Sequence, residues 1–167
     1  MNKYYLGVDL GSTTSKAVII NEQDEIIGRG ITNTRANYAV AADIARDEAV
    51  YNARFSILKK KLEGEIKANP HYKRYIDDLE SVFQYEQFKV RLDKLGEELL
   101  KTSRVFFKDE ETQEKMLGHL RNIRRAFKPE IKHDYLYNNL GAKNQFFRDI
   151  VSEKYNAEVN KLELALF

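Results

Sequence analysis

Gly7-Val8-Asp9-Leu10-Gly11-Ser12-Thr13-Thr14-Ser15-Lys16 is the stretch that decides the expected fold of the N-terminal region. Apolar side chains precede it at Tyr4 to Leu6, and a second apolar run, Ala17 to Ile20, follows it. Two short apolar runs separated by turn formers predict two strands joined by a tight turn. An aspartate at the end of the first strand, followed by a Gly-Ser-Thr-Thr turn, suits a site for a metal ion and a phosphate.

The candidate binding residues all lie on this hairpin. Gly11 lets the backbone approach a ligand closely and can adopt a positive φ. The N–H groups of Gly11 to Thr14 can form a concave nest for an anion. Asp9 can orient Mg²⁺ through its waters, and Lys16 offers a point charge to phosphate oxygens. The predicted site residues are Asp9, Gly11, Ser12, Thr13, Thr14 and Lys16, with Asp9 as the magnesium residue.

These residues carry a resemblance to a known family. The hairpin stretch resembles the first phosphate motif of the acetate and sugar kinase/Hsp70/actin superfamily of ATP-binding proteins. Two further stretches are similar to the ATPase subunits of benzoyl-CoA reductase and the activators of 2-hydroxyacyl-CoA dehydratases. They are Gly28-Arg29-Gly30-Ile31-Thr32-Asn33-Thr34-Arg35-Ala36-Asn37-Tyr38 and Ala49-Val50-Tyr51-Asn52-Ala53-Arg54-Phe55. The latter looks like the start of a helical insertion found in the larger reductase subunits.

The resemblance implies an actin-like (ribonuclease H-like) fold that binds Mg-ATP or Mg-ADP. Carried over from the superfamily, Asp9 would hold Mg²⁺ through water, the Gly11–Thr14 turn would donate to the β and γ phosphates, and Lys16 would reach a phosphate. The implied activity is ATP hydrolysis that drives a low-potential electron to an acyl-CoA reductase or dehydratase. The implied partners are the remainder of the ATPase subunit, a homologous ATPase subunit and the reductase component.

Other parts of the family pattern are missing from this chain. The family uses a second phosphate loop with another Asp, a glycine-rich adenosine site and cysteines that hold a [4Fe–4S] cluster. This chain has no Cys, and the glycines after residue 35 are isolated. We therefore expect the N-terminal part of such an ATPase, with no complete catalytic set and no activity of its own.

Composition sets the expected class of protein. The chain has 167 residues, of which 43% are hydrophobic and 32% charged, which is typical of a globular, helix-rich protein. A net charge of +2 is too small to indicate a nucleic-acid partner. No apolar run approaches the roughly 20 residues that span a bilayer, and no signal-peptide pattern is seen at the N-terminus. We expect a soluble cytoplasmic protein with no membrane partner.

The chain has two regions of different texture. Residues 1–35 are rich in β-branched residues and glycine, and predict strands over residues 4–9, 14–21 and 25–32. Residues 36–167 have apolar side chains three and four apart, which predicts a long-helix bundle. The resemblance implies that this bundle is the helical insertion. The expected fold class is therefore α+β and mostly helical, with residues 1–35 as a phosphate-binding strand hairpin plus a third strand.

Helix boundaries follow from caps and prolines. A first helix is predicted over residues 38–69, with Ala41, Ala45, Ile57, Leu58 and Leu62 on or near its inner face. Asn69 and Pro70 begin a second helix, and Asp109 caps a third that ends before Pro129. A fourth is predicted over residues 142–164.

Some features of the helical region have more than one interpretation. Asn37 or Thr34 caps the first helix, or the two belong to a functional loop. Cationic side chains at the predicted end of the third helix complement its dipole, or they contact an anionic partner. These side chains are Arg121, Arg124, Arg125, Lys128 and Lys132. Adjacent aromatic residues at Phe106 and Phe107 are expected in the core.

Two other functions compete with the electron-activating ATPase. One is a helical protein-interaction module that keeps a vestigial nucleotide hairpin. The other is a sugar-kinase or chaperone-type member of the same superfamily, which shares the first phosphate motif.

Overall fold

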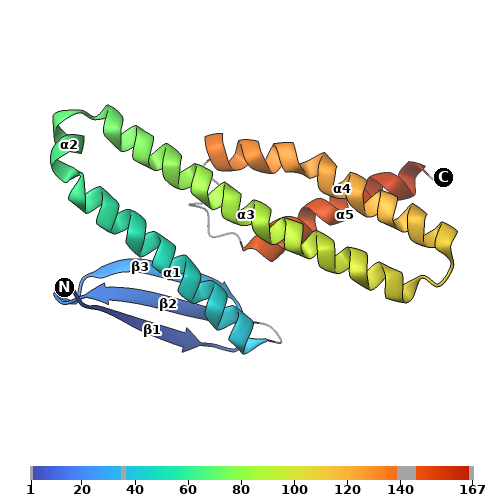
Figure 1. The fold of residues 1–167 in the computed structure, drawn as a ribbon, viewed down its shortest axis with the longest axis horizontal. Coiled ribbons are helices and arrows are strands. Elements are labelled where there is room, and N and C mark those ends of the chain that lie inside the picture. Colours follow the sequence, from blue (N-terminus) through green and yellow to red (C-terminus); the bar gives the residue numbers. More distant parts are fainter. Residues whose placement is uncertain (1, 35–36, 139–145, 166–167) are drawn as a thin grey trace. The chain divides into compact units, whose positions relative to one another are not determined.

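The computed structural model describes residues 2–34, 37–138 and 146–165. Its elements are β1 (Tyr4–Leu10), β2 (Thr14–Asn21), β3 (Ile26–Asn33), α1 (Tyr38–Lys61), α2 (Glu63–Ala68), α3 (His71–Phe106), α4 (Glu110–Tyr137) and α5 (Phe147–Ala165) (Figure 1). The protein is α+β and mostly helical, with a three-stranded sheet followed by helices, which confirms that part of the expected fold class.

Contacts group the chain into two compact units, Met1–Asp77 and Asp78–Phe167. The first unit contains the sheet, α1, α2 and the first turns of α3, and the second contains the rest of α3 with α4 and α5. The units divide the chain at a different place from the change in sequence texture at residue 35, because α1 packs on the sheet.

The sheet has the order β1-β2-β3 and is antiparallel throughout. Asp9 lies opposite Lys16, and Thr14 lies opposite Asn33. Between β2 and β3 the register shifts, since Ile19 pairs with Gly28 but Ile20 pairs with Ile26. All three strands therefore form where the apolar alternation predicts them, with ends that differ by one residue at most.

The side chain of Asn21 shapes the turn between β2 and β3. The Oδ1 atom of Asn21 accepts hydrogen bonds from the backbone N–H groups of Gln23 (3.0 Å) and Glu25 (2.9 Å). Asp24 has a φ of 59°, a conformation in which a short polar side chain is tolerated. This local network fixes the direction in which β3 returns along β2.

Helix α1 covers one face of β2 and β3 with a row of alanines at Ala41, Ala45, Ala49 and Ala53, all buried. Three of them, Ala45, Ala49 and Ala53, pack against Ala17 and Ile19 of β2. The helix backbone also approaches the glycines of β3: a Cβ atom on Gly28 would lie 2.8 Å from the backbone nitrogen of Ala53, and one on Gly30 would lie 2.8 Å from that of Ala49. Only glycine fits at either position.

The predicted apolar face of α1 is buried to different degrees along its length. Ala41 and Ala45 are buried, and Ile57, Leu58 and Leu62 are partly buried. The predicted helix over residues 38–69 also ends early, at Lys61, with α2 following after Leu62. Asn69 accepts a hydrogen bond from the N–H of His71 (3.1 Å), which confirms the start of the next helix beside Pro70.

Large side chains form the core of the second unit. Phe88 and Leu92 of α3 pack with Ile123 and Ile131 of α4 and with Ile150 and Val151 of α5. The ring of Phe88 lies 4.9 Å from that of Phe147 and 5.6 Å from that of Tyr135, measured between centroids. This core confirms that apolar residues at helical spacing mark buried faces here.

Helix α4 does not end before Pro129. It begins at the predicted cap, where Asp109 Oδ1 accepts a hydrogen bond from the N–H of Thr112 (2.7 Å), and it continues through Pro129 to Tyr137. The buried side chains of Ile123 and Ile131 lie on both sides of the proline. Their burial in one core holds the helix together where the proline removes a hydrogen bond.

The position of Pro129 also corrects the interpretation of the basic stretch. Arg121, Arg124, Arg125, Lys128 and Lys132 lie in the middle of α4, whose last turn has no basic residue. They therefore do not complement the C-terminal end of the helix dipole. Instead Asp93 of α3 lies 3.0 Å from Lys128 Nζ and 3.7 Å from Arg124 Nη1, so two of these cations join α4 to α3.

Two further predictions have mixed outcomes. Phe106 is 75% exposed, so its placement in the core is wrong, and Phe107 is partly buried. The predicted fourth helix is observed as α5 with Ile150 and Val151 buried, but its expected start at Ala142 lies outside the described residues.

In the part of the chain that the structure describes, no helix has the length and apolar character needed to cross a membrane.

Candidate phosphate-binding site

The turn between β1 and β2 is closed by its own backbone. The N–H of Gly11 donates to the carbonyl oxygen of Thr14 (3.1 Å), which leaves Ser12 and Thr13 at the tip. A Cβ atom on Gly11 would lie 2.7 Å from that same carbonyl oxygen. Glycine is therefore needed at residue 11 so that the two strands can approach each other, and among the described glycines none has a positive φ.

This geometry corrects the predicted nest of four amides. Because the N–H of Gly11 is already bonded to Thr14, it is not available to a ligand. The N–H groups of Ser12 and Thr13 have no hydrogen-bond partner within residues 2–34, 37–138 and 146–165, and both residues are exposed. The groups open to an anion at the tip of the turn therefore include the amides of Ser12 and Thr13, together with the exposed hydroxyl groups of the same two residues.

Asp9 and Lys16 lie directly opposite each other on β1 and β2. Residues that face each other in an antiparallel pair project from the same side of the sheet. That side is the one away from α1, since the neighbouring residues Ser15 and Ala17 are buried beneath the helix while Lys16 is exposed. Neither charged side chain forms an ion pair with a described residue, so both are available to a ligand.

Thr34, the residue that follows β3, hydrogen-bonds to the turn between β1 and β2. The N–H of Thr34 donates to the carbonyl oxygen of Thr13 (3.0 Å), and the Thr34 hydroxyl lies 2.8 Å from that of Ser15 in a buried hydrogen bond. These contacts tie Thr13 and Ser15 to the residue that follows β3, so the turn is anchored to the sheet on that side. Donors that are anchored in this way lose less freedom when an anion binds.

Sequence reasoning missed these contacts of Thr34. Thr34 is not a helix cap, because Asn37 caps α1 by accepting a hydrogen bond from the N–H of Val40 (3.1 Å). Ser15 was assigned no role. The alternation of β2 places Ser15 on the buried face beside Ala17, and a buried polar side chain needs a hydrogen-bond partner. This pattern could have predicted a partner for Ser15.

The donor set at the hairpin fits a magnesium-bound polyphosphate better than a metal ion alone. Among the described residues there is no group of three or more His, Asp or Glu side chains that could hold a metal. Asp9 by itself suits Mg²⁺ that keeps several waters and binds phosphate oxygens at the same time. The amides of Ser12 and Thr13 and the ammonium group of Lys16 suit those oxygens.

Other groups used by the resembled family do not fit this chain. With no Cys in the sequence, it has no thiolate to hold an iron–sulfur cluster. The hairpin offers donors to a phosphate from one side only, and no described residue at the turn is placed to activate a water molecule. The described residues at the turn therefore offer phosphate ligands from one side only, whereas stabilising the charge that develops during hydrolysis needs donors from several directions.

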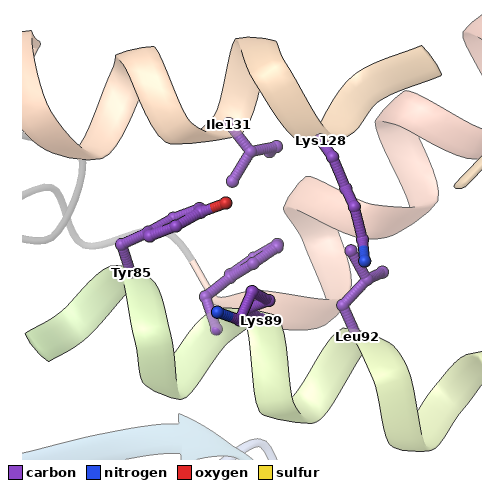
Figure 2. A pocket seen from close by; sticks show the side chains of 6 residues that line it. Tyr85, Lys89, Leu92, Lys128 and Ile131 are labelled. Carbon is purple, nitrogen blue, oxygen red and sulfur yellow. The ribbon is translucent and has the colours of Figure 1, made fainter. Parts of the chain in front are cut away.

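A recess in the second unit is not a binding site. It lies between α3 and α4 and is lined by Tyr85, Phe88, Lys89, Leu92, Lys128 and Ile131 (Figure 2). Its interior does not admit a water molecule. The recess therefore reflects the packing of the helical core and the ion pair between Asp93 and Lys128.

The second stretch of the resemblance has structural roles in this fold. Gly28 and Gly30 lie under α1, Thr34 braces the turn, and Asn37 caps α1. In this fold the two glycines serve the packing of α1 on the sheet, Thr34 serves the turn and Asn37 serves the start of α1.

Comparison of the chain with models of known protein families, with curated proteins and with solved structures found no match. The functional interpretation therefore depends on the hairpin itself and on the likeness of its sequence to the ATP-binding superfamily.

Proposed function

We propose that this chain carries the first phosphate loop of an ATP-binding protein with an actin-like fold. The observation that supports the proposal is the braced turn at Gly11–Thr14, which presents the free amides of Ser12 and Thr13 beside Asp9 and Lys16. In this proposal the amides and Lys16 bind the β and γ phosphates of ATP or ADP. Asp9 orients Mg²⁺ through its waters, and bound Mg²⁺ neutralises phosphate charge.

Sequence likeness alone supports the finer assignment. The stretches 28–38 and 49–55 are similar to the ATPase subunits of benzoyl-CoA reductase and the activators of 2-hydroxyacyl-CoA dehydratases. We propose on that basis that the chain serves an ATPase that drives low-potential electron transfer to an acyl-CoA reductase or dehydratase. The cluster cysteines, the adenosine site and the second phosphate loop would come from elsewhere in that assembly.

The direct test is isothermal titration calorimetry of the chain with Mg-ATP and Mg-ADP. Gly11→Val is the key variant, because a side chain there would collide with the carbonyl oxygen of Thr14 and open the turn. Gly7→Val is the matched control on the same strand, since a Cβ atom at Gly7 meets only Val18 at 3.7 Å. We expect binding by the wild type and the control, and loss of binding in Gly11→Val and in Asp9→Ala.

Two outcomes would contradict the proposal. If the folded wild-type chain bound neither nucleotide, the interaction-module alternative would replace it. If Gly11→Val bound as well as Gly7→Val, the phosphates would bind somewhere other than this turn. Loss of binding is informative only if the variant is folded, so the circular dichroism spectrum of each variant is compared with that of the wild type.

A hydrolysis assay separates binding from catalysis. We expect no ATP turnover by the chain alone, because one hairpin stabilises the developing charge from one side only. Turnover that disappears in Asp9→Ala would show that the chain contains a complete active site and would overturn the one-sided description of the hairpin.

A further inference from the structure

The outer edge of β1 is a row of unpaired backbone groups. The N–H of Gly11 points toward β2, and the backbone groups of alternate residues in a strand point to opposite edges. The N–H and C=O groups of Tyr4, Leu6, Val8 and Leu10 therefore point away from β2. Within residues 2–34, 37–138 and 146–165, no backbone group pairs with that side of β1. Figure 1 shows β1 as the edge strand of the sheet.

The opposite edge of the same sheet is protected. The side chain of Glu48 on α1 accepts a hydrogen bond from the N–H of Ile31 (3.0 Å), and Asn52 on α1 donates to the carbonyl oxygen of Arg29 (2.6 Å). These bonds occupy outward backbone groups of β3, so another strand cannot use them. Among the residues that the structure describes, none bonds to the outer edge of β1, and β1 itself has no proline and no bulge.

Apolar side chains are exposed along β1 on both faces. On the side that faces α1, Tyr4, Leu6, Val8 and Leu10 are 43–47% exposed, because the alanine row of α1 covers β2 and β3. On the open side, Tyr5 is 54% exposed. An apolar edge strand of seven residues without a described backbone partner is a template for another strand.

We propose that the occupant of this edge is β1 of a second copy of the chain, in an antiparallel pair centred on Leu6. In that register Leu6 lies opposite Leu6 of the other copy and Tyr4 lies opposite Val8, so the outward backbone groups of both strands hydrogen-bond each other. Tyr5 lies opposite Gly7 of the other copy. The two sheets join into one of six strands.

Charge selects this register. The charged residues at the two ends of the edge are Lys3 and Asp9, both exposed and without an ion pair to any described residue. Centring on Leu6 places Lys3 of each copy opposite Asp9 of the other, which forms two favourable cross-strand pairs. Centring on Gly7 instead would place Lys3 opposite Gly11 and Asp9 opposite Tyr5, and both charge pairs would be lost.

The first test is cysteine crosslinking, which has no background because the chain contains no Cys. Directly opposite residues in a hydrogen-bonded pair have Cα atoms about 5.5 Å apart, within the range of a disulfide. In the proposed register Leu6→Cys meets itself and should form a disulfide-linked dimer under mild oxidation. Gly7→Cys is the matched control, since its diagonal separation of about 7–8 Å is beyond that range.

The second test is charge reversal, followed by sedimentation velocity over a wide range of concentrations. Lys3→Glu places like charges opposite each other at two positions, and we expect the dimer dissociation constant to rise about tenfold or more. Asp9→Lys should have the same effect. The double variant Lys3→Glu/Asp9→Lys restores opposite charges and should restore the dimer.

Each contrary result overturns the proposal. A wild-type chain that stays monomeric throughout has no such pair. Crosslinking of Gly7→Cys in place of Leu6→Cys would reject the register, and failure of the double variant to recover would reject the charge pairs. All measurements are made without nucleotide, so their outcome is independent of the proposed ATP site.

Discussion

The two units of this chain bury their apolar surface in different ways. In the first unit, α1 lies on the sheet through alanines and glycines, so that helix backbone meets strand backbone at Gly28 and Gly30. In the second, the core is filled by large side chains such as Phe88, Leu92 and Ile131. The first contact depends on the absence of side-chain atoms, and the second depends on their presence. Enlarging a side chain should therefore be most damaging in the first unit, and truncating one should be most damaging in the second.

The largest effect is expected from Gly30→Val in the first unit. Its side chain would collide with the backbone of α1 at Ala45 and Ala49, and a helix backbone cannot rotate out of the way as a side chain can. Overpacking usually costs about 1–3 kcal/mol and sometimes more, and we expect a loss above about 3 kcal/mol here. Urea unfolding followed by circular dichroism measures it.

Gly7→Val is the control for that experiment, because its Cβ atom has only an ordinary contact with Val18. We expect a change close to zero, or a small gain from replacing glycine in a strand. Similar losses in the two variants would mean that α1 does not pack against β3 through these glycines.

The second unit should respond most to removal of a side chain. Leu92 is 1% exposed, and Leu92→Ala should lower the free energy of unfolding by about 2–5 kcal/mol because it leaves a cavity. Leu79→Ala on the same helix is the control, since Leu79 is 53% exposed. Equal losses in chemical denaturation would contradict the core described for this unit.

Pro129 tests whether α4 is continuous. Inside a helix, proline removes one hydrogen bond and costs about 3 kcal/mol relative to alanine, so Pro129→Ala should stabilise the chain by about 1–3 kcal/mol. Pro70→Ala is the control, because Pro70 precedes α3, where proline is tolerated. If Pro129→Ala gave no gain in thermal stability, a helix that ends before Pro129 would be the better description.

The smallest expected effect is a pH dependence at the start of α3. A hydrogen bond from Lys73 is the main cause of a lowered pKa for Asp77, and Lys59 lowers it further. Because the pKa of Asp77 is lower in the folded chain than the ordinary 3.8, its contribution is present above that pH. It is lost as the pH falls through the folded pKa.

Solvent screens this carboxyl group, so Asp77→Asn should cost at most about 1 kcal/mol at neutral pH. The difference from the wild type should vanish in acid. Glu65→Gln is the control, since its exposed side chain has no ion pair to a described residue. Urea unfolding at neutral and acidic pH decides the matter: a difference that persisted below the ordinary Asp pKa would assign the effect to something other than ionisation.

Local sequence signals predicted much of this fold. The strands, the cap at Asp109, and the core residues Ile123, Ile150 and Val151 follow from alternation, capping chemistry and helical spacing. The same reasoning was incomplete at α1, where it favoured Ile57 and Leu58 over the alanines at residues 49 and 53. Alanines at residues 49 and 53 are buried because the sheet beneath them offers glycines. The sequence of the helix alone does not show this, and its spacing pattern points to the largest apolar residues instead. Sequence reasoning also ended α4 at Pro129, because a local rule does not include the packing that holds the helix on both sides.

At the candidate site, the sequence by itself determined which groups are present: Asp9, a glycine-containing turn and Lys16 on one hairpin. It could do so because strand alternation and turn chemistry are local properties. Only the tertiary structure decided which of those groups are available. The bond from Gly11 to Thr14 removes one predicted donor, and the contact of Ser15 with Thr34, nineteen residues away, anchors the turn to the sheet. The Gly11–Thr14 bond is closed within one turn, but the pairing of Ser15 with Thr34 depends on how β3 returns beside β2, which is a property of the folded sheet and not of any one segment.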